Sequence, residues 1–196
     1  MLSWNGDIFA EPPIERLLDA AASGGLALAV APRRLAEGTV GIDASGAVVR
    51  LRGERFGVEA VGGDYIGVTA LGARALADLP DAGCLIGDYA LPALREGRQV
   101  LTVPVLGSWT DIGSIAAYHA ANLRWLEQRA PASGSWIHPS ARVESTVTVL
   151  QSILGEGASA EGTGTIERCV VWPGARVTAP LRDAVVTTAG RVVPAQ

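Results

Sequence analysis

Short apolar runs and amphipathic stripes alternate along the first 129 residues. Residues 2–4 (Leu-Ser-Trp) predict a short strand, and Pro12 and Pro13 precede a stripe of apolar residues at helical spacing that predicts a helix over 14–22. Residues 26–30 are continuously apolar, as in a strand that is buried on both faces. This succession of strand, helix and strand is typical of an α/β layer.

The pattern then predicts six further elements before a long helix. Alternating segments at 38–43 and 47–51 flank Ala44-Ser45-Gly46 and predict a β-hairpin. A strand is predicted over 62–68 and another over 100–106, with helices over 70–79 and 88–97. Ser114 is a suitable N-cap for a helix over 115–129.

A change of period marks a second region. Residues 130–135 have the composition of a linker, so we predict one domain over 1–129 and another over 136–196. Ile137, Val143 and Val149 recur every six residues, and the segments 153–158, 170–175 and 185–190 resemble one another. Short apolar pieces with small residues at corners are typical of hexapeptide repeats, which predicts a short left-handed parallel β-helix.

Composition narrows the function classes. The 196 residues are 48% hydrophobic with a net charge of −4, and all 16 basic residues are arginine. A mildly acidic chain without a basic run argues against binding to nucleic acid or a membrane surface, while small anions remain possible ligands. Cys84 and Cys169 lie far apart, which favours two buried free thiols in a reducing compartment. No apolar run spans a membrane and no signal peptide is evident, so we expect a cytoplasmic protein.

Two aspartates stand beside glycines at predicted strand-to-loop exits. One is Asp7 in Asn5-Gly6-Asp7-Ile8, and the other is Asp111 in Trp109-Thr110-Asp111-Ile112-Gly113-Ser114. Glycine lets the backbone approach a ligand, and carboxylate oxygens bind hard cations. The two aspartates are therefore candidates for a magnesium site that serves phosphate chemistry. The alternative is that each aspartate satisfies nearby backbone N–H groups in a turn.

These motifs and their order resemble the sugar-1-phosphate nucleotidyltransferases, in particular the mannose-1-phosphate guanylyltransferase branch. The resemblance covers nearly the whole chain and is carried by the two aspartate motifs, Glu37-Gly38-Thr39-Val40 with Asp43 and Gly46, Tyr65-Ile66-Gly67-Val68, Tyr118, Asn122 and the C-terminal repeats. It implies an α/β fold whose first domain is part of a Rossmann-like nucleotidyltransferase domain. The implied reaction transfers a nucleotidyl group from a nucleoside triphosphate to a sugar 1-phosphate and releases pyrophosphate.

The resemblance also implies roles for individual residues. Asp7 and Asp111 would hold the catalytic Mg²⁺. Asn5, Gly6 and Gly38 would contact the sugar phosphate, and Gly63 or Gly67 would leave room for it. Asp64 would either line that pocket or be solvated at a strand entry. The family's Glu-Lys-Pro is absent after the hairpin, so Arg52 or Arg55 would replace its lysine, although arginine's planar fork differs from an ammonium group.

The sequence departs from the family's pattern in a second way, which bears on whether the chain is an enzyme or a binding subunit. The family's glycine-rich GxGTRLxPLT loop, which holds the triphosphate, does not occur in this sequence. We therefore expect a partial enzyme that releases no pyrophosphate alone or, alternatively, a non-catalytic regulatory or sugar-phosphate-binding subunit. A hexapeptide acyltransferase that uses His138 as a base is less favoured, since an ordinary corner residue explains His138. His119 is expected on a helix face, and the β-helix is the expected site of contact in a homo-oligomer.

Overall fold

The computed structural model describes residues 1–129 and 134–195. The chain divides into two compact units, unit 1 from Met1 to Thr110 and unit 2 from Asp111 to Gln196. The helix predicted over 115–129 therefore belongs with the C-terminal region. The fold as a whole is mixed α/β, with a β-solenoid of about three turns in unit 2. In the part of the chain that the structure describes, no helix is long and apolar enough to cross a membrane.

Unit 1 is built on a seven-stranded mixed sheet with β7 at its centre. β7 is antiparallel to three strands, β1, β3 and β4, and β3 is in turn parallel to β8. The predicted hairpin is confirmed, since β4 and β5 pair antiparallel. The strands are β1 (Leu2–Trp4), β3 (Leu26–Arg33), β4 (Val40–Ile42), β5 (Val48–Leu51), β6 (Glu54–Arg55), β7 (Val61–Leu71) and β8 (Leu101–Pro104).

Helices cover the two faces of this sheet. On one face, α1 (Ile14–Gly24) buries Leu17 and Ala21 in an alanine-rich core beneath it. On the other face, a π-helical turn η1 (Leu85–Ala90) runs into α3 (Leu91–Arg95), which buries Leu91 and Leu94. Two short strands, β2 (Ile8–Ala10) and β9 (Trp109–Asp111), pair apart from the main sheet.

The predicted helix over 70–79 is wrong at its start. β7 continues to Leu71 because Ala70 and Leu71 pair with the beginning of β3. The apolar side chain of Leu71 is buried in the sheet core, and only α2 (Ala73–Ala77) is helical. An apolar residue at helical spacing was thus a strand residue, because sheet pairing overrode the local pattern.

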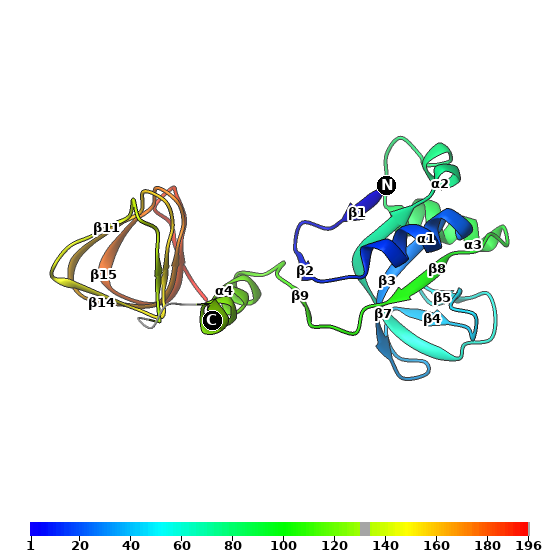
Figure 1. The fold of residues 1–196 in the computed structure, drawn as a ribbon, viewed down its shortest axis with the longest axis horizontal. Helices are drawn as coiled ribbons and strands as arrows, with labels where there is room; N and C mark the ends of the chain where they lie inside the picture. The colour runs from blue at the N-terminus through cyan, green and yellow to red at the C-terminus, as the bar shows by residue number, and fades with distance from the viewer. Residues whose placement is uncertain (130–133, 196) are drawn as a thin grey trace. The chain divides into compact units, whose positions relative to one another are not determined.

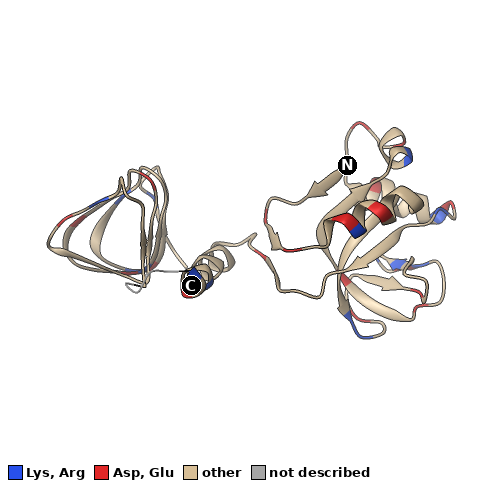
Figure 2. Cartoon of the chain, viewed as in Figure 1, with Lys and Arg blue, Asp and Glu red and all other residues tan. Residues whose placement is uncertain are grey.

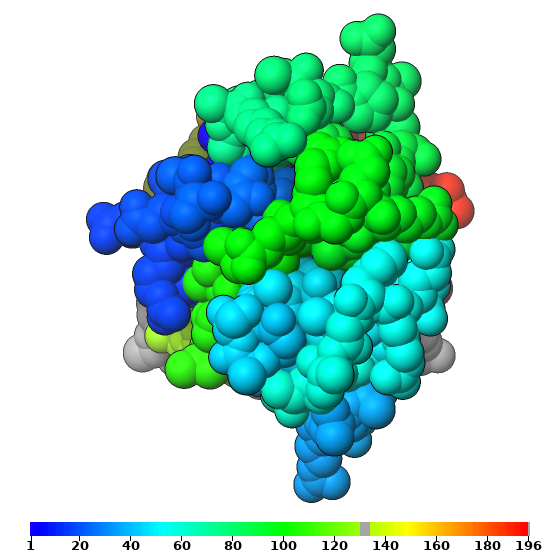
Figure 3. Space-filling view, turned by 90° about the vertical axis from the view of Figure 1, so that its right-hand side faces the viewer, coloured from blue at the N-terminus to red at the C-terminus, as the bar shows by residue number. Residues whose placement is uncertain are grey.

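The sheet of unit 1 curls until β8, at one edge, meets the segment that leads into β5 near the other edge. Ala47, just before β5, forms an isolated bridge with Leu101 of β8. The Val48 N–H donates to Val100 O at 2.8 Å, and the Thr102 N–H donates to Gly46 O at 2.9 Å. Figure 3 shows the β4–β5 region (cyan) and the β8 region (green) side by side on this face. The core of unit 1 is therefore enclosed by a curved sheet.

Unit 2 contains a solenoid of stacked coils, which appear as nested triangles in Figure 1. Trp136 pairs with Ile153, Ile153 with Val170, and Val170 with Val185, all in parallel. The steps are 17, 17 and 15 residues, so the similarity that the sequence shows among 153–158, 170–175 and 185–190 is confirmed as structural register. The strands are β10 (Trp136–Ile137), β11 (Arg142–Val143), β12 (Val147–Leu150), β13 (Ile153–Leu154), β14 (Ser159–Val171), β15 (Arg176–Val186) and the antiparallel β16 (Val192–Pro194).

Two of the residues that recur every six positions, Ile137 and Val143, belong to the first coil, and each begins a column of inward side chains that continues in the next coil. Ile137 stacks on Leu154, and Val143 stacks on Ala160. Leu154 and Ala160 are 0% and 1% exposed, whereas Ile137 and Val143 are 42% and 37% exposed. The difference arises because each inner residue of a solenoid is buried by the coils on both sides, and the first coil has a neighbour on one side only.

One corner of the solenoid repeats an unusual backbone conformation. Gly134, Gln151, Arg168 and Asp183 have φ of 69°, 45°, 51° and 48°, one residue in each successive coil. Only the first is a glycine, so the tight corner is imposed on larger residues by the pairing of the strands. We define coil 1 as 134–150, coil 2 as 151–167 and coil 3 as 168–182.

Charged side chains of both signs are interspersed over the two units (Figure 2). In unit 2 some of them join neighbouring coils, since Arg168 pairs with Asp183 at 2.7 Å and Arg182 pairs with Glu167. These pairs are partly exposed, so each should contribute no more than about 1 kcal/mol to stability. The solenoid therefore depends chiefly on its buried columns.

The helix α4 (Ile115–Arg129) has the bounds that the sequence predicts, and it lies against the solenoid. Its N-cap is also confirmed, because Ser114 Oγ accepts the Ala117 N–H at 3.1 Å. Two edge-to-face aromatic contacts, each with ring centroids 6.4 Å apart, join Tyr118 to Trp172 and Trp125 to Trp136. α4 therefore reaches from coil 3 to coil 1.

Candidate functional site

A cavity of about 630 Å³ opens in unit 1 between β5, the start of β7 and η1. This size suits a small polar ligand such as a sugar phosphate. Three residues that the sequence assigned to substrate line it, namely Asn5, Gly38 and Arg52. The remaining lining is Ser3, Thr39, Arg50, Leu51, Gly53, Tyr65, Cys84, Leu85 and Ile86.

Arg52 is the cavity's available cation. It has φ of 48° and precedes Gly53 at 84°, which together form the tight two-residue turn between β5 and β6. An added Cβ on Gly87 would lie 2.7 Å from Arg52 Nη1, so the guanidinium lies close against the backbone of η1 at this glycine. Among the described residues no carboxylate forms an ion pair with Arg52, which leaves its charge available to an anion. Arg55 is exposed on β6 and does not line the cavity.

A second arginine holds the opposite wall in place. Arg50 Nε and Nη2 donate to the two carboxylate oxygens of Glu59 at 2.9 and 3.0 Å, and both side chains are nearly buried. The Arg50 guanidinium also donates to the carbonyls of Glu37, Gly38 and Val40. This bonding lowers the pKa of Glu59, chiefly through the hydrogen bond from Arg50. The segment that carries Gly38 and Thr39 is thereby fixed at the cavity rim.

Gly38 and Asp64 have structural tasks in this wall. Gly38 has φ of 73°, and an added Cβ there would lie 2.4 Å from Gly63 O, so the close approach of two backbones requires glycine. Asp64 accepts from Arg33 Nε at 2.6 Å and from the Thr39 N–H at 3.2 Å. Asp64 is absent from the cavity lining. Its carboxylate therefore acts on the cavity through the position of Thr39.

Asn5 is positioned by Gly67. The Asn5 N–H donates to Gly67 O at 2.9 Å, and Gly67 has φ of 78°. A Cβ on Gly67 would lie 2.8 Å from Asn5 Nδ2. Gly67 therefore makes room for the side chain of Asn5, which itself lines the cavity. Gly6 follows in the exposed turn that the Ile8 N–H closes onto Asn5 O at 3.2 Å.

The two predicted metal ligands lie in different units. Asp7 is exposed in the turn after β1, and its carboxylate makes no hydrogen bond or ion pair with the residues that the structure describes. Asp111 Oδ1 accepts the Gly113 N–H at 2.8 Å, as the alternative turn interpretation predicts, and Oδ2 is left for other contacts. Carboxylate oxygens of this kind suit Mg²⁺. Within residues 1–129 and 134–195, no three His, Cys, Asp or Glu side chains form a cluster for a metal. A magnesium ion shared by Asp7 and Asp111 stays a prediction.

For Cys84, which lines the cavity, the prediction of a buried thiol is wrong. It was expected to be buried, and it is exposed, whereas Cys169 is buried as expected. Backbone N–H groups of Gly87 and Ile86 lower the pKa of the Cys84 thiol, and the charge of Arg52 contributes further. Arg52 Nη2 lies 3.3 Å from Cys84 Sγ. The segment 79–84 (Leu-Pro-Asp-Ala-Gly-Cys) is rich in turn residues, which was the available signal that this thiol lies outside the core.

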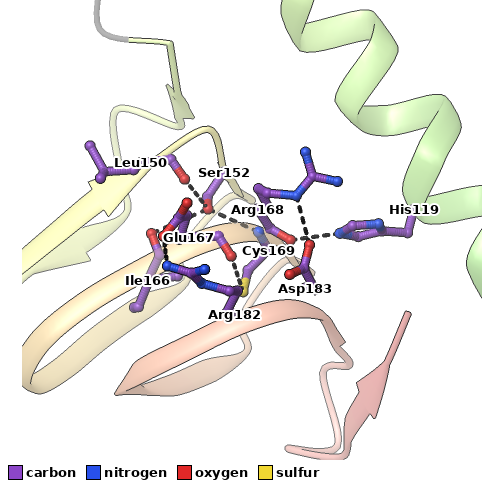
Figure 4. Close-up of polar contacts among 9 residues, drawn as sticks. All are labelled: His119, Leu150, Ser152, Ile166, Glu167, Arg168, Cys169, Arg182 and Asp183. Atoms are coloured by element: carbon purple, nitrogen blue, oxygen red, sulfur yellow. Dashed lines mark hydrogen bonds and ion pairs between the residues drawn. The ribbon is translucent and has the colours of Figure 1, made fainter. Parts of the chain in front are cut away.

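Unit 2 has a polar cluster of its own beneath α4 (Figure 4). His119 is 4% exposed, and its Nε2 lies 2.6 Å from Arg168 O. A carbonyl can only accept, so Nε2 carries the hydrogen. Ser152 is fully buried, and its hydroxyl accepts the Cys169 N–H at 2.9 Å and donates to Leu150 O at 2.7 Å. These polar groups hold strands and helix together, so the cluster is structural.

His138 is a corner residue, as the sequence favoured. Its Nδ1 accepts the Ser140 N–H at 3.2 Å and lies 2.8 Å from Ser140 Oγ. Ser140 Oγ in turn accepts the Gly157 N–H from the next coil at 2.9 Å. The imidazole therefore closes a turn, and this contact argues against its use as the base of an acyltransferase.

The fold and the cavity together define a two-part protein, a mixed α/β unit with an anion-compatible cavity and a unit built on a β-solenoid. No protein-family model matches the chain, and no curated protein matches it. Among solved structures, the chain is similar to the crystal structure of HddC from Yersinia pseudotuberculosis, with 19% sequence identity and a TM-score of 0.47. The match covers 62% of this chain and 53% of that one, so this chain accounts for about half the length of that structure.

Proposed function

We propose that unit 1 binds a sugar 1-phosphate in its cavity and that the chain serves the synthesis of nucleotide sugars. One observation carries this proposal. Asn5, Gly38 and Arg52, which lie far apart in the sequence and which the family resemblance assigns to the sugar phosphate, line the same cavity. The phosphate would pair with Arg52, and the sugar hydroxyls would bond to Asn5, Ser3 and Thr39.

The reaction in which this site would take part is nucleotidyl transfer. A phosphate oxygen of the sugar 1-phosphate attacks the α-phosphorus of a nucleoside triphosphate, and the bond from that phosphorus to the bridging oxygen of pyrophosphate breaks. The protein's share is to hold the two anions in line. Mg²⁺, held by Asp7 and Asp111, would supply positive charge to offset the negative charge of the phosphates. The Rossmann-like character of unit 1 and the left-handed sense of the solenoid belong to the same proposal.

A binding experiment tests the site. Calorimetric titration of the full chain with mannose 1-phosphate and glucose 1-phosphate should show one site per chain for at least one of them. Arg52→Ala should weaken binding about 10- to 100-fold, since a charge-assisted contact to phosphate contributes about 1.5–3 kcal/mol. Arg55→Ala is the matched control, because it removes an arginine of the same hairpin that lies outside the cavity. Equal binding by the wild type and Arg52→Ala would refute the assignment.

The second candidate is a sugar-phosphate-binding subunit without catalysis. The absence of the sequence GxGTRLxPLT from these residues favours it. Release of pyrophosphate from each nucleoside triphosphate with the bound sugar phosphate and Mg²⁺ separates the two candidates. We expect binding without release from this chain alone. Measurable turnover would establish the enzyme and show that the glycine-rich loop is dispensable.

A further inference from the structure

The first coil of the solenoid presents an open strand edge. β11 pairs with β14 of the next coil, and the Arg142 and Glu144 N–H groups donate across this pairing to Ala158 O and Ala160 O at 2.9 and 3.0 Å. Successive backbone N–H groups of a strand point to opposite edges. The N–H and C=O of Val143, which lies between them, therefore point away from coil 2.

Apolar side chains at this edge remain uncovered. Ile137 and Val143 head inward columns and are 42% and 37% exposed. The opposite end differs, because β16 turns back antiparallel along β15 and covers part of the last coil. An open edge with apolar residues is a template for pairing with another strand.

The charged residues on either side of Val143 favour a second copy of this chain as the partner of the open edge. Arg142 forms no ion pair with the residues that the structure describes, and Glu144 follows two positions later on the same side of the strand. In an antiparallel pair of two β11 strands centred on Val143, each Arg142 lies opposite the other copy's Glu144. The two Val143 residues then exchange both backbone hydrogen bonds, as a hydrogen-bonded antiparallel pair requires.

We propose that two copies of this chain associate through their first coils, with β11 of one copy antiparallel to β11 of the other about a two-fold axis at Val143. The interface is self-complementary in charge, in backbone bonding and in apolar surface, and these are the properties of an isologous contact. A head-to-tail stack is disfavoured because β16 occupies one face of the other end. This inference does not depend on which ligand the cavity of unit 1 binds.

Charge reversal and mixing test the interface. Sedimentation or light scattering of the full chain at low salt should give a dimer. Arg142→Glu places two like-charged pairs in the interface and should weaken dimerisation about 100-fold, because directly opposed like charges destabilise paired strands. Glu144→Arg should do the same. An equimolar mixture of the two variants should recover a dimer, because the glutamate introduced at position 142 then faces the arginine introduced at position 144, and the native Arg142 and Glu144 face each other.

The mixture distinguishes the proposed pairing from a general loss of structure, because two damaged chains would not repair each other. Glu144 also accepts the Gly162 N–H at 2.7 Å, so Val143→Glu provides a second disruptive variant if Glu144→Arg fails to fold. Arg191→Glu, an equal charge reversal before β16, should leave the dimer intact. A monomeric wild type at about 200 µM, which corresponds to an affinity no tighter than the millimolar range, would overturn the proposal. A dimer that survives both Arg142→Glu and Val143→Glu would overturn it as well.

Discussion

Most strand pairs of unit 1 join segments that lie far apart in the sequence, as β7 does with β3 and β4, whereas the parallel strands of unit 2 pair with segments 15 or 17 residues later. The polar contacts of unit 1 accordingly do not repeat along the chain. Arg50 alone donates hydrogen bonds to three backbone carbonyls and to Glu59. In unit 2 the same environment recurs in successive coils, as the stacked serines Ser135 and Ser152 show. Loss of one group should therefore disturb unit 1 widely and unit 2 locally, and the following experiments test this difference.

The largest effect is expected from Glu59→Ala. It leaves the Arg50 guanidinium, whose side chain is 13% exposed, without its carboxylate partner. Removing one member of a buried pair costs about 3–5 kcal/mol, and we expect about 3 kcal/mol for the unfolding of unit 1. Hydrogen exchange measured by mass spectrometry would show the loss across β3, β4 and β7.

The matched control for this prediction lies in unit 2. Glu161→Ala removes the partner of Arg176, whose side chain is 72% exposed, and the expected loss is under about 0.5 kcal/mol. Equal losses for Glu59→Ala and Glu161→Ala would contradict the view that unit 1 depends on individual buried groups.

Lowering the pH should destabilise unit 1 of the wild-type chain, as Glu59→Ala does. The pKa values of Asp43, Glu54 and Glu59 are lowered, by hydrogen bonds from Ser45, Arg95 and Arg50 respectively, and all three lie in unit 1. A lowered folded-state pKa gives stability that is present above the unfolded pKa of about 4 and is lost as the pH falls through the folded value. Hydrogen exchange should therefore show unit 1 opening before unit 2 below about pH 4. The reverse order would contradict this.

A smaller loss is expected from Ser152→Ala in unit 2. The substitution leaves the Cys169 N–H and Leu150 O without their buried hydroxyl partner, which costs about 2 kcal/mol. Exchange should quicken mainly in coils 2 and 3. Ser145→Ala, at an exposed position of coil 1, should change the free energy of unfolding by less than about 0.5 kcal/mol. Loss of protection throughout unit 2 would show that the coils unfold as one cooperative block.

The least disruptive comparison uses the two thiols. Cys84 is exposed with a lowered pKa, while burial raises the pKa of Cys169. The thiolate is the reactive form, so iodoacetamide should label Cys84 in the native chain at neutral pH and Cys169 only after unfolding. Arg52→Ala should move the labelling of Cys84 to higher pH. Unchanged labelling would show that Arg52 does not act on the thiolate.

The elements that sequence predicted best are those whose signals are local. The bounds of α4 followed from Ser114 and a long helical pattern, and the echo at Ile153 and Val170 followed from repeated spacing. Leu71 was misassigned because its partner, Leu26, lies 45 residues away. Of the site, Asn5, Gly38 and Arg52 came from the family resemblance. Cys84, which precedes η1, lines the cavity beside residues of β5 and β7, and no local pattern encodes this packing between distant segments.

The rise of helix α4 along its axis also matches the spacing of the coils in the solenoid. His119 contacts Arg168 at the start of coil 3, and Trp125, six residues later, contacts Trp136 in coil 1. Six helical residues rise about 9 Å, and two steps between neighbouring strands measure about 9.6 Å. The two periodic structures therefore match at both contacts without bending. A solenoid lengthened by one 17-residue coil between these contacts would need about three more helical residues to keep both, so the helix length sets the number of coils that lie between its two contacts.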